Sequence, residues 1–381
     1  MRYLSALFAA AAVRSALAHP GSPHPDAQGR YTLEADGIKA QFIPYGATLT
    51  NLFVKDASGK QQDIVLGYDN TSYYPVDPGH PVYNAIPGRY VNRIGNGQYS
   101  IGETVYHTEK NDGPNTLHSG TNNWSYRVWN VSAVTNSSIT FSISDASNSS
   151  LGMIGRVDAS VTYSVSKNKW SISMDATSPE AKTPLMLTQH TYFQLDAFTR
   201  PENRTVWDHT VYMPEAKRVL VADANALPTG EIATIPAGAI DDFWSEPHQL
   251  GFAADQAGFE NHCGTGCHGY NGAWAFNAER NKSATVLTLK SMYSGIVASL
   301  TTNQEAVILY TCNWNDGKSE FKNTQGVVGQ DKFIPRDGCI AIEAQDYVDG
   351  INHPEWGRLS KQISGPGDKY HWASSWTFGT A

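Results

Sequence analysis

Three short segments of the chain each carry one side chain that can move a proton. His118 follows a turn in the run GPNTLHSG, His190 lies in TQHTYFQL, and Glu343 lies in GCIAIEAQ. Imidazole and carboxyl groups act as general acids and bases when the structure holds them beside the reacting atoms. Two histidines and one glutamate, each on its own strand or strand edge, could therefore supply a general acid and a general base to one small pocket.

The strand pattern around Glu343 leaves two interpretations open. Successive side chains of a strand point to opposite faces, so Glu343 shares a face with Ala341 and not with Ile340 or Ile342. A carboxylate on an inner or cleft face would lose water, and its pKa would rise toward the range of a general base. A carboxylate on the outer face would be an ordinary surface residue.

The histidines and arginines have similar alternatives. His190 lies in so apolar a stretch that a hydrogen-bonded core residue is a more frequent outcome than a catalyst. His118 is next to a Gly-Pro-Asn turn, and loop positions more often carry function. Arg89 and Arg93 both lie in PGRYVNRIGNG. One of them could form a structural ion pair while the other binds substrate oxygens through its planar guanidinium.

Short alternating runs predict that strands position these residues. The run SITFSIS at 138–144 alternates with period two, and Lys167-Asn168-Lys169 between two such runs predicts a hairpin turn. Long helical periodicity is nearly absent. No repeat or linker divides residues 31–381, so we expect an all-β fold, one large antiparallel β-sandwich. The strand-like runs are 38–43, 63–66, 138–143, 159–165, 170–176, 285–289, 306–312 and 339–344.

The order of the motifs resembles that of the aldose 1-epimerase (galactose mutarotase) family. GRYVNRI and NDGPNTLHSG resemble the family's G-R-x-x-N-R-I and N-x-x-P-N-x-L-H-G-G signature. QHTYFQL resembles its N-H-x-Y-F-N-L segment, and GCIAIEAQDYVDGIN its E-T-Q and P-D-A-x-N segments. The resemblance covers residue 31 to the C-terminus. It implies a galactose mutarotase-like supersandwich and an isomerase that interconverts the α and β anomers of free hexoses.

Carried over position by position, the resemblance gives each site residue a role. Glu343 matches the general base that takes the proton from the anomeric hydroxyl, and His190 matches the general acid that protonates the ring oxygen. The sugar-binding positions are matched by Asn92, Arg93, His118 and Asn271. Asn271 stands where the family has an aspartate, and an asparagine donates as well as accepts hydrogen bonds and carries no charge.

This chemistry implies a short set of partners. Proton transfer at O1 and at the ring oxygen demands no metal, no other cofactor and no covalent intermediate, and the sequence has neither a phosphate-binding glycine loop nor a G-x-S-x-G turn. The formal charge of −8 at pH 7 argues against nucleic acid or an anionic membrane as a partner. We therefore expect a free monosaccharide as substrate and a monomeric protein.

Two other functions fit parts of the pattern. A glycoside- or polysaccharide-modifying enzyme on the same sandwich would use paired carboxylates, and Asp241, Asp242 or Asp346 could supply the second one. A non-catalytic carbohydrate-binding protein that kept the pocket would account for Asn271. The presence of all three proton-moving residues argues against this last function.

The N-terminus resembles a secretory signal peptide over residues 1–18. A short basic start precedes an apolar run, and Ala16-Leu17-Ala18 forms a small-x-small cleavage site. The run is too short and broken to span a bilayer. Residues 19–30 are expected to form a flexible leader, and the mature protein is expected to be secreted. The sequons that fit export and glycosylation are at Asn70, Asn123, Asn130, Asn136, Asn148, Asn203 and Asn281.

The four cysteines fit the same expectation. An even number in an exported chain predicts two disulfides, with three possible connectivities. Cys263 and Cys267 could close a tight local loop, and Cys312 and Cys339, at the ends of apolar runs, could bridge neighbouring strands. A zinc site is the competing interpretation, for which the C-x3-C spacing lacks a convincing second half.

Overall fold

The fold is built from antiparallel sheets, as the sequence predicts. The computed structural model describes residues 23–79 and 81–381, so the predicted signal peptide lies outside the described residues. Within that part of the chain, no helix is long and apolar enough to cross a membrane. The helical turns are η1 (Thr71–Tyr73), η2 (Gly95–Gly97), η3 (Trp124–Tyr126), η4 (Pro354–Trp356) and α1 (Leu359–Gln362).

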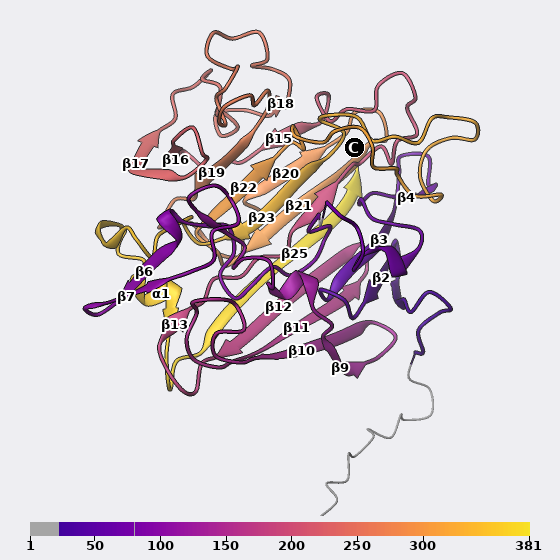
Figure 1. Ribbon diagram of the computed structural model, residues 1–381. Helices are drawn as coiled ribbons and strands as arrows, with labels where there is room; N and C mark the ends of the chain where they lie inside the picture. The colour runs from indigo at the N-terminus through magenta and orange to yellow at the C-terminus, as the bar shows by residue number, and fades with distance from the viewer. Residues whose placement is uncertain (1–22, 80) are drawn as a thin grey trace, which may run out of the picture.

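Two large sheets dominate the molecule (Figure 1). The nine-stranded sheet has the order β18 (His248–Gln249), β15 (Thr210–Tyr212), β20 (Leu287–Lys290), β21 (Ile296–Thr302), β25 (Tyr370–Thr380), β12 (Lys169–Thr177), β11 (Val157–Ser166), β10 (Ser138–Asp145) and β9 (Asn130–Val134). The six-stranded sheet has the order β14 (Thr191–Phe193), β23 (Ile340–Gln345), β22 (Ala306–Tyr310), β19 (Asn271–Ala275), β16 (Arg218–Ala222) and β17 (Pro228–Thr234).

The remaining strands form smaller sheets around these two. A four-stranded sheet contains β1 (Tyr31–Ala35), β2 (Ile38–Ile43), β3 (Thr48–Lys55) and β4 (Gln61–Asp63). The two-stranded pairs are β13 (Thr183–Pro184) with β24 (Ile363–Ser364), β5 (Arg93–Ile94) with β8 (Thr116–Leu117), and β6 (Gln98–Ile101) with β7 (Thr104–His107).

The main core lies between the two large sheets. Trp274, Leu309 and Ile342 from the six-stranded sheet belong to the same buried cluster as residues of β25. Across this core, the Phe193 ring lies 4.8 Å from the ring of Trp376, centroid to centroid. Because side chains alternate along a strand, every second residue of the six-stranded sheet points away from this core, to the opposite face of the sheet.

Most predicted runs are strands, and one is not. The run 38–43 is β2, and the runs at 138–143, 159–165 and 170–176 lie inside β10, β11 and β12. Asn168 has a φ of 53° in the predicted hairpin turn. The run 63–66 is wrong as a strand, because β4 ends at Asp63. The backbone N–H of Ile64 donates to Leu52 in β3, whereas that of Leu66 donates to Tyr192 in β14, so the segment crosses between two sheets.

The end of the expected leader, residues 19–30, contacts the rest of the fold at Gln28 and Arg30. Gln28 accepts a hydrogen bond at its backbone carbonyl from the Thr71 hydroxyl, with a distance of 2.5 Å. Arg30 is buried, and its guanidinium donates to the carbonyls of Tyr68 and Asp69 at 3.0 and 2.6 Å. Composition rich in Pro, Gly and His therefore did not reveal that the end of this segment is fixed to the sandwich.

One of the two arginines in the PGRYVNRIGNG run is structural. Arg89 is fully buried and forms an ion pair with Asp145 at 2.7 Å. Its guanidinium also donates to the carbonyl of Gly155 at 2.7 Å and to the Thr183 hydroxyl at 3.1 Å. A buried charge is tolerated when its hydrogen bonds are satisfied in this way, so Arg89 fixes the start of the segment that carries Arg93.

Arg89→Met should lower the stability of the fold strongly, because it removes one of the two cations that pair with the buried Asp145 carboxylate, the other being Arg127. It also leaves the buried acceptors of Arg89 without their donor. We expect the free energy of unfolding to fall by about 3–5 kcal/mol, measured by urea unfolding followed by tryptophan fluorescence. Arg156→Met is the matched control, since Arg156 pairs with Asp158 at the surface. It should change the stability by less than about 1 kcal/mol. Equal losses in both variants would contradict the assignment.

Candidate active site

The pairing of β14 with β23 brings His190 and Glu343 together. Thr191 pairs with Ile342 in the antiparallel register, so the residue before β14 lies next to Glu343 in β23. The Nε2 atom of His190 lies 3.2 Å from Oε1 of Glu343, with side-chain exposures of 6% and 3%. The two most important predicted residues thus form a direct, buried contact.

The contact between these two groups is shielded from water. Burial raises the pKa of Glu343 to about 8, although the positive charge of Arg93 acts to lower it. Burial also lowers the pKa of His190 to about 3. Both shifts disfavour the charged form of the group. Near neutral pH the pair therefore holds one proton between its two groups. This proton can move from one group to the other across the 3.2 Å contact.

Atoms for a ligand remain on both groups. Among the described residues, neither Oε2 of Glu343 nor Nδ1 of His190 has a hydrogen-bond partner, although both atoms are buried. Buried polar atoms are almost always paired in proteins, and an exception often marks a ligand or an ion position. Each group of the pair thus keeps one hydrogen-bonding atom that a ligand could use.

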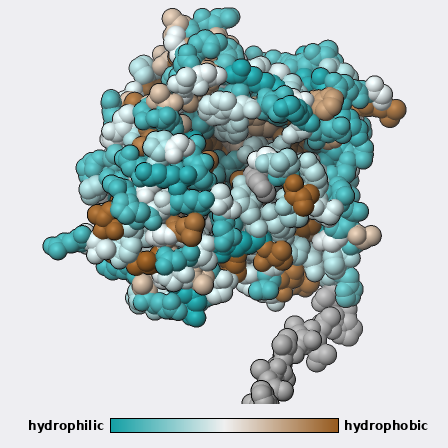
Figure 2. Space-filling model, viewed as in Figure 1, coloured by the Kyte–Doolittle hydropathy of each residue, from teal (hydrophilic) through white to brown (hydrophobic). Residues whose placement is uncertain are grey.

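The sheet face that carries Glu343 is the face away from the main core. Glu343 pairs with Ile308, and Ala341 pairs with Tyr310 on one side and Tyr192 on the other. Opposite residues of a sheet share a face, so Glu343 lies with Ala341 and not with Ile342, as the alternation predicts. The Tyr192 ring stacks on the His190 imidazole at 4.7 Å. Where Figure 1 shows β20 to β23, the surface in Figure 2 is hollowed, with apolar atoms at the bottom and hydrophilic residues around the rim.

His118 reaches the pair from a loop. Its ring centroid lies 5.4 Å from that of His190, and its Nδ1 accepts a hydrogen bond from the Asn92 backbone N–H at 3.2 Å. The neutral ring therefore carries its proton on Nε2. Burial lowers the pKa of His118 well below its usual value, and the charges of His190 and Arg93 act in the same direction. His118 is thus a neutral hydrogen-bond donor.

Arg93 is the second arginine of its segment and faces the site. Its Nε donates to the Asp112 carboxylate at 2.8 Å, and the side chain is 14% exposed. The Asn92 amide oxygen accepts a hydrogen bond from the Arg93 backbone N–H at 3.0 Å. The Arg93 charge acts on the pKa values of both His118 and Glu343. The structure therefore brings four predicted residues to one place: Arg93, His118, His190 and Glu343.

Asn271 lies on the same sheet face as Glu343. In the register, Asn271 pairs with Tyr310, and the neighbouring rung joins Ala273, Ile308 and Glu343. Asn271 therefore lies on the second strand from that of Glu343, in the next row of residues on the same face of the sheet. It is partly exposed. This position lets its side chain face a ligand that also touches Glu343.

The carboxylates proposed for glycoside cleavage are used elsewhere. Asp346 forms an ion pair with Arg358 at 2.6 Å. The Asp241 carboxylate pairs with the His262 imidazole at 2.8 Å. The Asp242 carboxylate accepts the backbone N–H groups of Gly238 and Trp244 at 2.7 and 3.1 Å. None of these three acids makes a pair with Glu343.

The cysteines form two disulfides, which overturns the zinc interpretation. Cys263 is bonded to Cys267, and Cys312 to Cys339, so both sulfur pairs are taken up. Among the predicted sequons, Asn123 is buried, and its amide nitrogen donates to the carbonyl of Gly120 at 3.0 Å.

Sequence reasoning missed the residues that support the pair. Asn84 donates its backbone N–H to the carbonyl of His190 at 3.0 Å, and its side-chain oxygen accepts the backbone N–H of Tyr192 at 2.8 Å. Asn84 thus fixes both residues of the imidazole–phenol stack. Tyr192 is two positions after His190 and could have been found from that spacing, whereas nothing in the sequence around Asn84 indicates its role.

Comparisons with known proteins agree with this geometry. The family model described as aldose 1-epimerase matches residues 29–376. The chain belongs to the aldose 1-epimerase family. A protein of Arthroderma benhamiae named probable aldose 1-epimerase is 33% identical over 90% of this chain and 85% of its own length. The galactose mutarotase of Mus musculus is 29% identical over 92% of this chain and 94% of its own length.

A solved structure supports the same conclusion. The GalM/aldose epimerase homologue from C. elegans superposes with a TM-score of 0.80 and 27% identity, covering 93% of this chain and 99% of the other. The fold is therefore that of galactose mutarotase, and the protein is an isomerase that interconverts sugar anomers. The substrates of this family are free sugars.

Glu343→Gln should make the folded protein more stable at alkaline pH. The pKa of Glu343 rises from 4.5 to about 8 on folding. Between those values the unfolded chain binds fewer protons than the folded one, so the free energy of unfolding falls as the pH rises. The variant keeps the shape and removes this titration.

At pH 8 we expect the free energy of unfolding of the variant to exceed that of wild type by an amount on the order of a few kcal/mol. This difference should shrink toward pH 4.5. Urea unfolding of both proteins across this range measures the difference. A variant that is less stable than wild type at pH 8 would show that contacts stabilise the carboxylate after all.

Proposed function

We propose that Glu343 is the general base and His190 the general acid for mutarotation of a free aldohexose. The observation that carries this assignment is the 3.2 Å contact between Nε2 of His190 and Oε1 of Glu343 in a buried site. Anomer exchange needs one group that accepts a proton and one that donates a proton on the same substrate. The pair supplies both from a single shared proton.

The shared proton permits a closed cycle. With the proton on His190, Glu343 takes the proton from the O1 hydroxyl while His190 donates to the ring oxygen, and the C1–O5 bond breaks. The product is the open-chain aldehyde, beside a protonated Glu343 and a neutral His190. Rotation about C1–C2 presents the other face of the carbonyl. Reversal of both proton transfers then closes the ring as the other anomer.

The pKa shifts favour the state that accompanies the open chain. Burial raises the pKa of Glu343 and lowers that of His190, which stabilises the protonated carboxyl next to the neutral imidazole. This lowers the free energy of the ring-opened intermediate relative to a site in which both groups stay charged. The cycle begins when the shared proton passes from Glu343 to His190 through the direct contact of the two groups.

Four further residues are proposed to hold the sugar. The Nε2–H of neutral His118 is a hydrogen-bond donor, and the Arg93 guanidinium is a cation that binds oxygens through several N–H groups. Asn92 keeps Arg93 in place through its amide oxygen. Asn271 can donate to a hydroxyl as well as accept from it, so the hydroxyl orientation it selects differs from that selected by an aspartate.

Glu343→Gln and His190→Asn should each slow mutarotation by about 10²–10⁴-fold, because each removes one partner of the proton exchange. Polarimetry of freshly dissolved α-glucose and α-galactose, corrected for the buffer rate, measures the loss. His371→Asn and Glu202→Gln are matched controls, since both residues are exposed and paired only at the surface. Either site variant retaining near wild-type turnover would exclude that residue from its assigned role.

The pH profile should follow the proton count of the pair. Catalytic efficiency is expected to fall above about pH 8, where Glu343 loses the shared proton, and the acid limb should lie well below the usual imidazole pKa of 6.5. The two limbs belong to the coupled pair and not to single residues. Progress curves from pH 3 to 10 measure this. A decline that begins near pH 6.5 on the acid side would contradict it.

We also propose that the protein is exported and works as a monomer. Two disulfides fit an oxidising compartment. N-terminal sequencing of the protein from culture medium should give a start near His19, and the unreduced, denatured protein should have no thiol that reacts. Light scattering at a mass of a dimer would contradict the monomer, and an intact N-terminus would contradict cleavage.

A further inference from the structure

The end of the GCIAIEAQDYVDGIN motif carries a carboxylate that the proposed chemistry does not use. Strand β23 ends at Gln345, and Asp349 lies in the turn that follows it. The side chain of Asp349 is 4% exposed. A carboxylate is buried at a cost unless hydrogen bonds satisfy it, so the partners of Asp349 indicate what it does.

The main partner of Asp349 is the segment that carries Arg93. The Oδ1 atom of Asp349 accepts the backbone N–H of Gly95 at 3.0 Å, and this hydrogen bond is buried. Gly95 directly follows β5, which consists of Arg93 and Ile94. A hydrogen bond from a backbone N–H to an ionised carboxylate is stronger than one between neutral groups. This side chain therefore holds the end of the Arg93 strand.

The neighbours of Asp349 in the turn make contacts to the same segment. Asn352 donates its amide group to Oδ1 of Asp349 at 2.7 Å and to the carbonyl of Gln98 at 3.0 Å. Ile351 belongs to the same buried cluster as Ile94. The turn after β23 thus contacts the chain on both sides of η2.

The contact between Asp349 and Gly95 leaves no space for a larger residue. A β-carbon at Gly95 would lie 2.6 Å from Oδ2 of Asp349 and 3.2 Å from Cδ2 of Leu227. Leu227 closes the contact from the loop between β16 and β17. Because the backbone of Gly95 and the carboxylate fit so closely, neither can move without displacing the other.

This contact joins the two halves of the candidate site. In one half, β5 pairs with β8, with Arg93 opposite Leu117, and His118 directly follows β8. In the other half, β23 carries Glu343 and pairs with β14, which follows His190. The β5–β8 pair has two residues in each strand. So short a pair has little stability of its own, so contacts from outside must fix its position.

The outside contacts fix the Arg93 segment at both ends. Before β5, the backbone N–H of Val91 donates to the carbonyl of Met186 at 2.8 Å. After β5, Gly95 donates to Asp349. Arg93 lies between these two points. A displacement of about 1 Å in a group that positions the substrate can cost about 10²-fold in rate, so the second point matters for the site.

We propose that Asp349 is a positioning residue of this enzyme, which holds Arg93 and His118 in the place relative to Glu343 that sugar binding requires. Asp349 touches neither the sugar nor the reacting atoms. The proposal rests on the proposed roles of Arg93 and His118 in holding the sugar. Loss of the carboxylate should therefore weaken sugar binding more than it slows the proton transfers of Glu343 and His190.

The test separates KM from kcat in mutarotation of α-glucose and α-galactose, followed by polarimetry. Asp349→Ala should raise KM roughly tenfold and lower kcat by less than about threefold. Asp349→Asn keeps an oxygen that accepts the Gly95 N–H and should recover most of the wild-type KM. A wild-type KM in Asp349→Ala, or an Asp349→Asn variant as impaired as Asp349→Ala, would overturn the proposal.

Gly95→Ala tests the same contact from the other side, in a chain that keeps the carboxylate. Its β-carbon displaces Oδ2 of Asp349, so KM should rise by a similar factor. In the Asp349→Ala background the same substitution should add little, because the contact is already lost. Factors in KM that multiply in the double variant would show that the two residues act independently, which would contradict the proposal.

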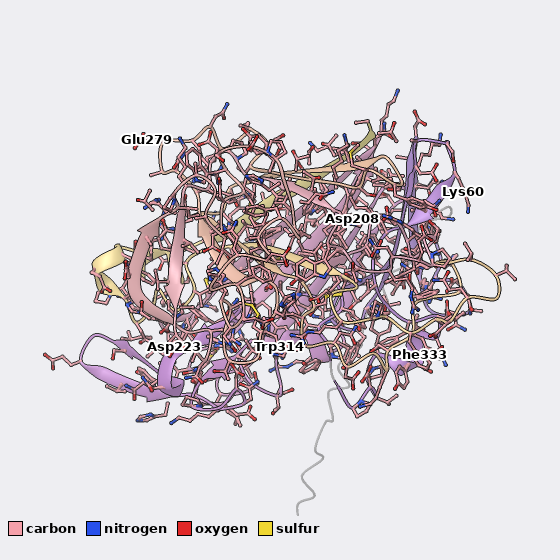
Figure 3. The ribbon with its side chains drawn as sticks, turned by 90° about the horizontal axis from the view of Figure 1, so that it is seen from above. Lys60, Asp208, Asp223, Glu279, Trp314 and Phe333 are labelled. Atoms are coloured by element: carbon pink, nitrogen blue, oxygen red, sulfur yellow. A yellow bond between two sulfur atoms is a disulfide. The ribbon has the colours of Figure 1, made fainter. Side chains whose placement is uncertain are left out.

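Asp56→Ala is the matched control. The Asp56 carboxylate also holds a turn, since it accepts the backbone N–H groups of Ser58 and Lys60 at 2.9 and 3.0 Å. Figure 3 shows Lys60 at the opposite side of the molecule from Asp223, which begins the loop that borders Gly95. The control should keep the wild-type KM. An equal rise of KM in both Asp→Ala variants would mean that loss of any turn-holding carboxylate weakens sugar binding, and the proposal would be wrong.

Glu343→Gln, measured in the same assay, separates this proposal from the one on which it rests. If Asp349→Ala keeps the wild-type KM while Glu343→Gln has lost turnover, the positioning role fails and the acid–base pair stands. If Asp349→Ala keeps the wild-type KM and Glu343→Gln keeps its turnover, both proposals fail.

Discussion

The antiparallel pairing of β14 with β23 is the constraint on which the site depends. It joins segments about 150 residues apart in the sequence, and backbone hydrogen bonds fix its register. A slip of one residue would turn Glu343 into the main core and Ile342 toward the hollow. The apolar face of β23 therefore protects the orientation of the carboxylate, because Ile340 and Ile342 are held by the core between the sheets.

The same constraint explains the chemical state of the pair. A strand position surrounded by rings excludes water, so both groups resist charge, and the contact between them is the nearest place for the proton. Burying a carboxyl in this manner costs stability. The protein compensates with packed elements around the site: the Arg89–Asp145 ion pair below the Arg93 segment, Asn84 behind the stack, and the Cys312–Cys339 disulfide at the start of β23.

Sequence patterns correctly predicted features that depend on residues close together in the chain. Alternation correctly placed Glu343 on the face of Ala341 and away from Ile340 and Ile342, but it left open whether that face was buried. The turn at Asn168 is confirmed. One of the two arginines is structural, as the sequence allowed, but the sequence did not show that this one is Arg89. The run at 63–66 failed because tertiary hydrogen bonds, and not alternation, decide its path. His190 stayed ambiguous until the pairing with a strand far along the chain was known. The role of Asn84 depends on long-range packing, and nothing in the sequence near it predicts that role.

One feature of the nine-stranded sheet affects how the protein can be made. Strand β25, at residues 370–380, lies between β12 and β21 and pairs with both. Until it is in place, those two strands have open edges, and open edges recruit other chains. A recombinant chain that lacks residues 370–380 would therefore keep two unpaired strand edges and would be prone to associate with other chains.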